Sequence, residues 1–167
     1  MNVVLIGMSG SGKSVIGRLL ARELSYTFID VDDLIERKIQ MHLQEFIDTF
    51  GDEDFIKLEE ETIVELNIQR CVIALGGSCI YSQKAMDHLK KDSIIVFLDV
   101  SLEVLQSQIT EIEKRGIVYL KRKSYDELFE ERLPRYHQYS DITVRTDSLK
   151  VEQIIEQIKR SVQPHLS

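Results

Sequence analysis

The stretch Gly7-Met8-Ser9-Gly10-Ser11-Gly12-Lys13-Ser14 decides the fold of this chain. It follows a short apolar run at residues 3–6 and precedes residues 14–24, where apolar side chains recur with helical spacing. The pattern G-x-x-x-x-G-K-[ST] is typical of a loop that wraps nucleotide phosphates, because glycines let successive backbone N–H groups point at phosphate oxygens. Chance would produce it in roughly 1% of chains this long, or fewer. The stretch therefore predicts a site for a nucleoside triphosphate.

Two side chains of this loop carry the expected chemistry. Lys13 should reach the β- and γ-phosphates of the nucleotide, and the Ser14 hydroxyl should bind Mg²⁺. The helix that follows adds positive potential at its amino end. The predicted contacts with the nucleotide are Gly7, Ser9, Gly10, Ser11, Gly12, Lys13, Ser14 and Val15.

The rest of the chain alternates short apolar runs with amphipathic segments, which predicts an α/β fold with a parallel sheet covered by helices on both faces. In such sheets, ligands bind beyond the carboxyl ends of the strands. We expect Pro134 to kink or divide the helix that contains it. The expected strands are 3–6, 26–29, 71–75, 94–98 and 142–144, and the expected helices are 14–24, 32–39, 43–50, 55–68, 83–89, 102–109, 124–139 and 151–162.

A second carboxylate is needed near the loop to help hold the metal. A usual Walker B strand ends in aspartate, but the run at 71–75 is followed by Gly76-Gly77. Asp30 ends the second strand and lies close to the loop if that strand is one position away from the first, and Asp99 closes the fourth. Besides Ser14, the candidate metal ligands are therefore Asp30 and Asp99.

Composition excludes several classes of protein. The 167 residues, 43% of them apolar, suffice for one hydrophobic core, so we expect a single domain over 1–167. A net charge of −7 argues against nucleic acid as a partner, because phosphate backbones bind cationic surfaces. The sequence has no apolar run near the ~20 residues of a membrane span. We expect a monomeric, cytoplasmic protein whose two cysteines, Cys71 and Cys79, stay reduced.

Three motifs beyond the loop carry a resemblance to a known family. They are Phe28-Ile29-Asp30-Val31-Asp32-Asp33-Leu34-Ile35-Glu36, Leu75-Gly76-Gly77 and Glu131-Arg132-Leu133-Pro134-Arg135-Tyr136. In this order and spacing the chain resembles the shikimate kinases over essentially its whole length. The resemblance implies the P-loop NTPase fold of the nucleoside-monophosphate-kinase type, with a five-stranded parallel sheet in the order 2-3-1-4-5. It also implies a substrate-binding region at about 31–60, a mobile lid at about 112–124, and Mg²⁺-dependent phosphoryl transfer from ATP to shikimate.

The resemblance also implies roles for acidic residues. Asp30 corresponds to a carboxylate that reaches Mg²⁺ through water. Asp32 corresponds to the acid that binds the substrate hydroxyls and orients or deprotonates the attacking one. Glu59 matches a second acidic residue of the substrate site.

The remaining implied roles concern the other end of the acceptor and the moving phosphoryl group. Gly76 and Gly77 resemble the backbone floor of the substrate site. Arg132 matches the arginine that pairs with the substrate carboxylate, and a forked guanidinium suits that task. Arg115 lies where the lid arginine is expected. The implied catalytic residues are thus Lys13, Asp32 and Arg115.

The chain departs from the family pattern at several positions. Ile56 stands where the family has a second substrate arginine, and Lys57, one residue on, is turned about 100° around the helix axis. Ser78 replaces the third glycine after the third strand, and Gln108 stands where an arginine stacks on adenine. Val15 replaces the usual Ser or Thr after the loop.

Simpler interpretations compete with these roles. Asp32 and Asp33 are also suited to cap the helix that follows them, and we favour that role for Asp33. Arg132 also suits a helix surface. The basic residues at 114–123 suit either a solvated face or a lid that closes over phosphates.

Three functional hypotheses follow: a shikimate kinase, a kinase of another small hydroxylated metabolite with less negative charge, and a nucleotide-binding regulatory domain without catalysis. Asp32 and Arg132 together argue against the third, because a regulatory domain has no need of them. Ile56 favours the second.

Ile56 generates a prediction about the acceptor. Each charge-assisted hydrogen bond to a carboxylate contributes roughly 1.5–3 kcal/mol, so a missing arginine should weaken shikimate binding about ten- to a hundredfold. We expect a high KM for shikimate, or a different preferred acceptor. If shikimate is the acceptor and position 56 faces the site, Ile56→Arg should lower the KM for shikimate. Tight shikimate binding in the unmodified protein, without improvement in Ile56→Arg, would contradict this prediction.

Overall fold

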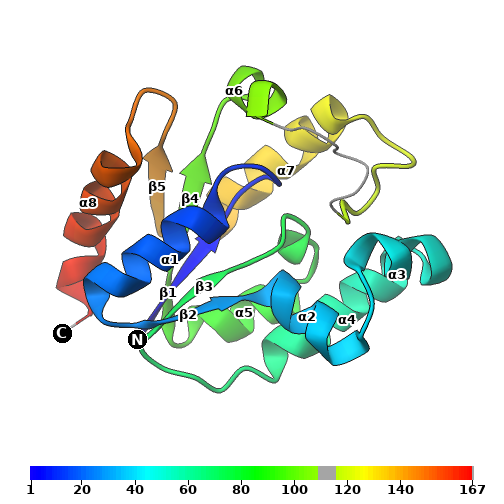
Figure 1. The fold of residues 1–167 in the computed structure, drawn as a ribbon, viewed down its shortest axis with the longest axis horizontal. Coiled ribbons are helices and arrows are strands. Elements are labelled where there is room, and N and C mark those ends of the chain that lie inside the picture. The colour runs from blue at the N-terminus through cyan, green and yellow to red at the C-terminus, as the bar shows by residue number, and fades with distance from the viewer. Residues whose placement is uncertain (109–115, 167) are drawn as a thin grey trace.

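A computed structural model describes residues 1–108 and 116–166 of the protein (Figure 1). Five strands form one parallel sheet in the order β2-β3-β1-β4-β5. Val4 of the central strand pairs with Ile73 on one side and Ile95 on the other. The expected fold class and strand order are thereby confirmed. The strands are β1 (Asn2–Ile6), β2 (Thr27–Asp30), β3 (Cys71–Ala74), β4 (Ser93–Asp99) and β5 (Ile142–Arg145).

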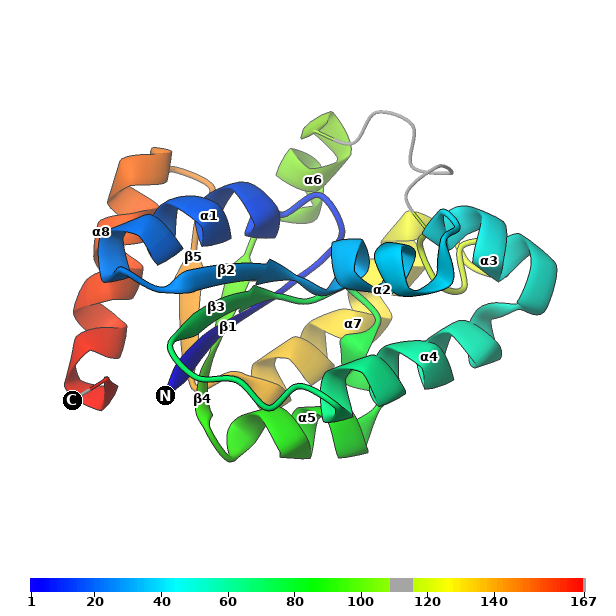
Figure 2. The same cartoon turned by 60° about the horizontal axis from the view of Figure 1, so that its bottom comes forward.

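Helices cover both faces of the sheet, with α1 and α8 on one side and α5 and α7 on the other (Figure 2). Three further helices, α2, α3 and α4, lie together beyond the carboxyl end of β2. The α-helices are α1 (Lys13–Leu24), α2 (Val31–Ile39), α3 (Leu43–Phe50), α4 (Asp52–Val64), α5 (Gln83–Lys90), α6 (Leu102–Gln108), α7 (Tyr125–Tyr139) and α8 (Val151–Val162). Short 3₁₀ turns span Cys79–Tyr81 and Gln163–His165. No helix within the described residues is long and apolar enough to cross a membrane.

The central strand has a core on each of its faces because successive strand residues point in opposite directions. Val3 and Leu5 pack in the apolar cluster formed with α1 and α8. Val4 and Ile6 pack in the larger cluster, which includes residues of α4, α5 and α7. All four side chains are fully buried, which explains why β1 reads as an uninterrupted apolar run.

Two expectations about helices need correction. Pro134 does not divide its helix: α7 runs continuously from Tyr125 to Tyr139. Pro134 and Glu130, whose carbonyl loses its usual donor, are both exposed, so water can satisfy that carbonyl while the buried Leu128, Arg132 and Tyr136 hold the helix in place. The helix expected at 55–68 instead spans Asp52–Val64, because Gly51 precedes it with φ +94°, a backbone conformation that favours glycine, and three acidic residues occupy its first turn.

The layer between α1, α8 and the sheet should be sensitive to lost volume. Leu20 of α1 is fully buried there, so Leu20→Ala should destabilise the protein by about 2–5 kcal/mol through lost burial and the cavity it leaves. Urea unfolding followed by circular dichroism measures this. Val151→Ala on the exposed side of α8 is the control and should cost less than about 1 kcal/mol. Equal effects of the two substitutions would contradict the assigned core.

Candidate active site

The loop between β1 and α1 has the conformation that its glycines predict. Gly7 has φ +150°, and a Cβ there would lie 2.9 Å from the Leu98 carbonyl oxygen. Gly12 precedes α1 with φ +87°, in the left-handed region. The chain can therefore turn sharply from the central strand into α1, which brings the amino end of the helix to the edge where the strands end.

Lys13 is folded back over this loop. Its Nζ donates to the carbonyl oxygens of Gly7 and Met8, both at 2.8 Å, and to Ser11 Oγ at 3.3 Å. The residue is only 8% exposed. Burial lowers the pKa of Lys13 to about 8, against the opposing attraction of Asp32. The ammonium is thus a desolvated positive charge at the phosphate loop.

A hydroxyl and a carboxylate meet beside Lys13. Ser14 Oγ donates to Asp30 Oδ2 at 2.5 Å. The other carboxylate oxygen of Asp30 accepts from the backbone N–H of Asp32 at 3.1 Å, so Asp30 caps α2. Asp33, expected to have this role, instead forms an exposed ion pair with Arg18 at 3.8 Å. The Ser14–Asp30 donor set fits Mg²⁺, which binds few protein oxygens when phosphates supply the others.

Two further carboxylates flank Gly76. A Cβ on Gly76 would lie 2.7 Å from Glu59 Oε1 and 2.8 Å from Asp32 Oδ1, so both oxygens approach the same point. Asp32 is half-buried. Desolvation of its carboxyl group, together with the negative charge of Asp30, raises the pKa of Asp32 to about 6. Gly76 leaves these oxygens room that any side chain would fill.

Glu59 is buried against the other side of this point. The residue is 2% exposed, and Ser78 Oγ donates to Glu59 Oε2 at 2.8 Å. Within the described part of the chain, Glu59 Oε1 is the one buried side-chain oxygen without a hydrogen-bond partner. Burial, with the negative charge of Asp32, raises the pKa of Glu59 to about 8. Glu59 was expected to belong to the substrate site. Its carboxyl group lies beside that site, and burial strongly disfavours its charged form.

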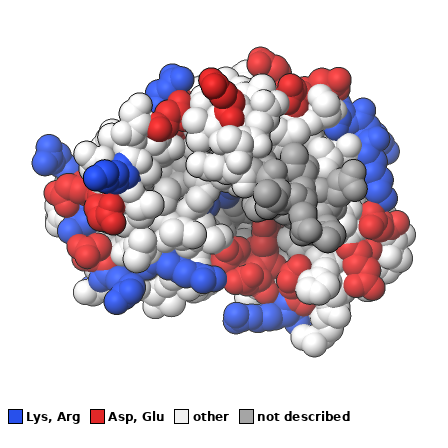
Figure 3. Space-filling model, turned by 45° about the horizontal axis from the view of Figure 1, so that its top comes forward, with Lys and Arg blue, Asp and Glu red and all other residues white. Residues whose placement is uncertain are grey.

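A cavity of about 470 Å³ joins the phosphate loop to the carboxylates. Figure 3 shows acidic side chains gathered beside a hollow on the face where the strands end. The lining residues include Lys13, Ser14, Asp30, Asp32, Gly76 and Gly77. Val15, Leu43 and Leu75 add apolar surface to its wall.

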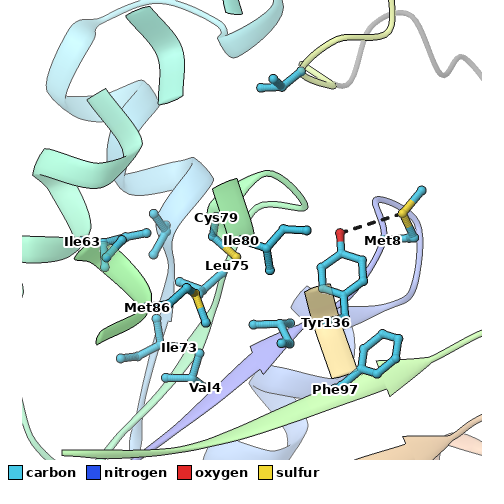
Figure 4. Packing of buried hydrophobic residues seen from close by; sticks show 14 of the residues in the cluster. Val4, Met8, Ile63, Ile73, Leu75, Cys79, Ile80, Met86, Phe97 and Tyr136 are labelled. Carbon is cyan, nitrogen blue, oxygen red and sulfur yellow. Dashed lines mark hydrogen bonds between the residues drawn. The ribbon is translucent and has the colours of Figure 1, made fainter. Parts of the chain in front are cut away.

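Arg132 lies behind Gly77 rather than among the residues that line this cavity. It is 1% exposed, and a Cβ on Gly77 would be 3.0 Å from its Nη1. Tyr136 Oη donates to the Gly77 carbonyl oxygen at 2.7 Å and lies near Met8, while its ring stacks on Phe97 (Figure 4). Arg132 is therefore a core arginine directed at the floor of the site, not a surface residue.

The described part of the expected lid, residues 116–124, contacts the expected substrate region. The Gly116 and Tyr119 backbone N–H groups donate to Gln44 Oε1 at 3.2 Å and Asp52 Oδ1 at 2.9 Å. Lys121 forms an ion pair with Asp48 at 2.6 Å. Arg115 lies outside the described residues.

Ile56 and Lys57, neighbours on α4, lie on different sides of this helix. Ile56 is half-buried and packs against the larger apolar cluster, while Lys57 is exposed. Neither side chain lines the cavity. Lys57 is thus no substitute for an arginine at position 56.

Several residues of the site gave no signal in the sequence. Ser78 was noted only as a missing glycine, yet it holds Glu59. Tyr125 Oη donates to the Ser9 carbonyl oxygen at 2.7 Å from the far end of the chain. Tyr81 contacts Arg132 through its hydroxyl at 3.2 Å. These are isolated residues in no motif, so only the fold reveals them.

A parallel sheet in this order, a phosphate loop with a buried lysine, and adjacent carboxylates define a P-loop phosphotransferase. The family model for shikimate kinase matches residues 9–163. Shikimate kinase of Vibrio cholerae is 34% identical to this chain, over 99% of the chain and 97% of the relative. The chain belongs to the shikimate kinase family.

Solved structures agree with this assignment. Shikimate kinase from Aquifex aeolicus superimposes with a TM-score of 0.84 at 30% identity, covering 99% of this chain and 98% of that one. Shikimate kinase from Acinetobacter baumannii in complex with shikimate gives a TM-score of 0.88 at 26% identity, covering 98% and 93%.

The buried carboxyl group of Glu59 predicts a pH-dependent effect on stability. In the unfolded chain Glu59 ionises near its usual pKa, but in the folded protein only near pH 8. The contribution of protonated Glu59 to the free energy of unfolding is therefore fully present below about pH 4.5. This contribution is lost as the pH rises through 8. The free energy of unfolding of Glu59→Gln, relative to that of the unmodified protein, should increase by roughly 1–3 kcal/mol between pH 5 and 8. Above pH 8 this difference should stay constant.

Denaturant unfolding at pH 5, 7 and 9 measures the difference. Glu61→Gln, on the exposed face of the same helix, is the matched control and should give a constant difference. A pH-independent effect of Glu59→Gln would show that Glu59 is ionised in the folded protein throughout.

Proposed function

We propose that this protein transfers the γ-phosphoryl group of ATP to a hydroxyl group of shikimate, giving shikimate 3-phosphate and ADP. The observation that carries the proposal is the approach of Asp32 to the phosphate loop, across a cavity that both line. Membership of the shikimate kinase family supports the choice of acceptor.

The phosphate end of the site would hold ATP. Backbone N–H groups of the loop face the phosphates, and Lys13 moves from its own carbonyl partners to the β- and γ-phosphates. Ser14 and Asp30 would hold Mg²⁺, which neutralises charge on the phosphate oxygens when it is bound.

The acceptor end would activate an alcohol. Asp32, with its pKa raised to about 6, is mostly ionised at neutral pH yet basic enough to accept a proton. The acceptor oxygen forms a bond to the γ-phosphorus while the bond to the β–γ bridging oxygen breaks, and the hydroxyl proton passes to Asp32. Because phosphoryl transfer depends mainly on positioning and charge, this arrangement suffices without a covalent intermediate.

The acceptor carboxylate would pair with Arg132 across Gly77, which has no side chain to separate them. Residues 116–124 would belong to a lid over the site, with Arg115 supplying positive charge to the moving phosphoryl group. We further propose that the protein acts as a cytoplasmic monomer without nucleic-acid or membrane partners. Its two buried cysteines form no disulfide, which suits a reducing compartment.

Ile56 supports a second candidate acceptor, another small hydroxylated metabolite with less negative charge. The half-buried Ile56 packs against apolar side chains and supplies no cation for a carboxylate. The two candidates share the chemistry at Asp32 and differ at the carboxylate end.

Asp32→Asn separates catalysis from nucleotide binding. The amide cannot accept the proton, so turnover of shikimate should fall at least about a hundredfold, while ATP affinity changes little. Lys13→Ala should instead weaken ATP binding, because it removes the buried cation of the loop. ADP release with shikimate and a panel of hydroxy acids and sugars, together with calorimetric ATP titrations, measures both effects. Wild-type turnover in Asp32→Asn would reduce Asp32 to a structural role; no activity on shikimate with good activity on another alcohol would favour the second candidate.

A further inference from the structure

We propose that Tyr81 is the positioning residue that sets Arg132 for the acceptor carboxylate. This inference rests on the proposed function, in which Arg132 pairs with that carboxylate. Tyr81 ends the short 3₁₀ turn Cys79–Tyr81, immediately after the glycine floor of the site.

Tyr81 contacts the guanidinium of Arg132 in two ways. Its Oη accepts a hydrogen bond from Arg132 Nε at 3.2 Å. The Arg132 Cζ also lies 5.3 Å from the centre of the Tyr81 ring, within the range of a cation–π contact. The hydrogen bond and the ring contact therefore both restrict the position of the guanidinium, although the same ring also contacts Arg135, whose Cζ lies 5.2 Å from the ring centre.

The hydroxyl of Tyr81 is itself oriented by a carboxylate. It donates to Glu131 Oε2 at 2.7 Å, which leaves its lone pairs for Arg132. Lys123 donates to the other oxygen, Glu131 Oε1, at 2.6 Å. These two hydrogen bonds lower the pKa of Glu131, so they stabilise its ionised form. Glu131 thus orients Tyr81, and the structure shows no direct hydrogen bond or ion pair between Glu131 and Arg132 among the described residues.

A second nitrogen of the guanidinium has a fixed partner as well. Arg132 Nη2 donates to the Val118 carbonyl oxygen at 2.8 Å. Nη1 then faces Gly77, close enough that a methyl group there would lie 3.0 Å away. Tyr81 and Val118 thus hold the arginine through Nε and Nη2, and Nη1 is directed at the site floor, with Tyr136 as a further hydrogen-bond partner.

This arrangement matters because of Ile56. With one arginine for the acceptor carboxylate, affinity depends on how little ordering that arginine needs when the acceptor arrives. A long side chain that is already fixed loses little rotamer freedom on binding. Tyr81 therefore acts on acceptor affinity through Arg132, without touching the reacting atoms.

Tyr81→Phe keeps the ring and removes the hydroxyl. Steady-state kinetics with shikimate and with its carboxamide, at saturating ATP, tests the inference. For the acid, kcat/KM should fall about tenfold, carried by KM, with kcat within about twofold. For the carboxamide, which gains little from a guanidinium, kcat/KM should change less than about twofold.

Tyr119→Phe is the matched control. Its ring packs edge-on against the Tyr81 ring, with 5.2 Å between the ring centres. Its hydroxyl, however, donates to Glu53 and not to Arg132 or Glu131. The ratio of kcat/KM for shikimate to kcat/KM for its carboxamide should stay as in the unmodified protein. Glu131→Gln, which keeps the shape and removes the charge, should lower the same ratio by a smaller factor and serves if Tyr81→Phe fails to fold.

An unchanged ratio in both Tyr81→Phe and Glu131→Gln, or an equal loss for the two acceptors, would overturn the inference while leaving the proposed function in place. A wild-type protein inactive on both acceptors would overturn the proposed function and the inference with it.

Discussion

Four ionisable side chains withdrawn from water at the ends of the strands determine the character of this molecule. Lys13, Glu59 and Arg132 are buried, and Asp32 is half-buried. Desolvation is the largest influence on the pKa of Lys13, Asp32 and Glu59. Burying such charges costs stability unless they pair, and here pairing is incomplete because Glu59 Oε1 has no partner among the described residues. A cost of this kind is typical of a site kept for function.

The parallel sheet is what brings these groups together. The strand order places β3 between β1 and β2, so the phosphate loop, Asp30 and Gly76 reach one edge from separate parts of the chain. Gly76 and Gly77 then let Asp32, Glu59 and Arg132 approach where side chains would keep them apart. The site is therefore a consequence of strand order together with two absent side chains.

The sequence predicted those features of the site that reside in local pattern. The phosphate loop and the runs of apolar residues each have a characteristic spacing, and they gave the loop and the α/β class. The strand order and the expected place of Arg132 came from the resemblance to shikimate kinases. The capping role of Asp30 was missed because neighbouring aspartates offered the same chemistry within three residues.

Contacts between distant residues were out of reach. Ser78 meets Glu59 across 19 residues, Tyr81 meets Arg132 across 51, and Tyr125 meets Ser9 across 116. No periodicity or motif encodes such pairs. Pro134 shows the opposite case: a strong local rule predicted a kink or a division of the helix, and the helix is not divided at this exposed position.

We infer that the buried charges form a site for phosphoryl transfer from ATP to an alcohol that carries a carboxylate. Phosphorus-31 NMR of the purified protein incubated with ATP, Mg²⁺ and shikimate tests it most directly. We expect a new phosphomonoester resonance that is coupled to a ring proton of the acceptor. Its intensity should increase together with the amount of ADP. Release of inorganic phosphate alone, or an unchanged ATP spectrum, would contradict it.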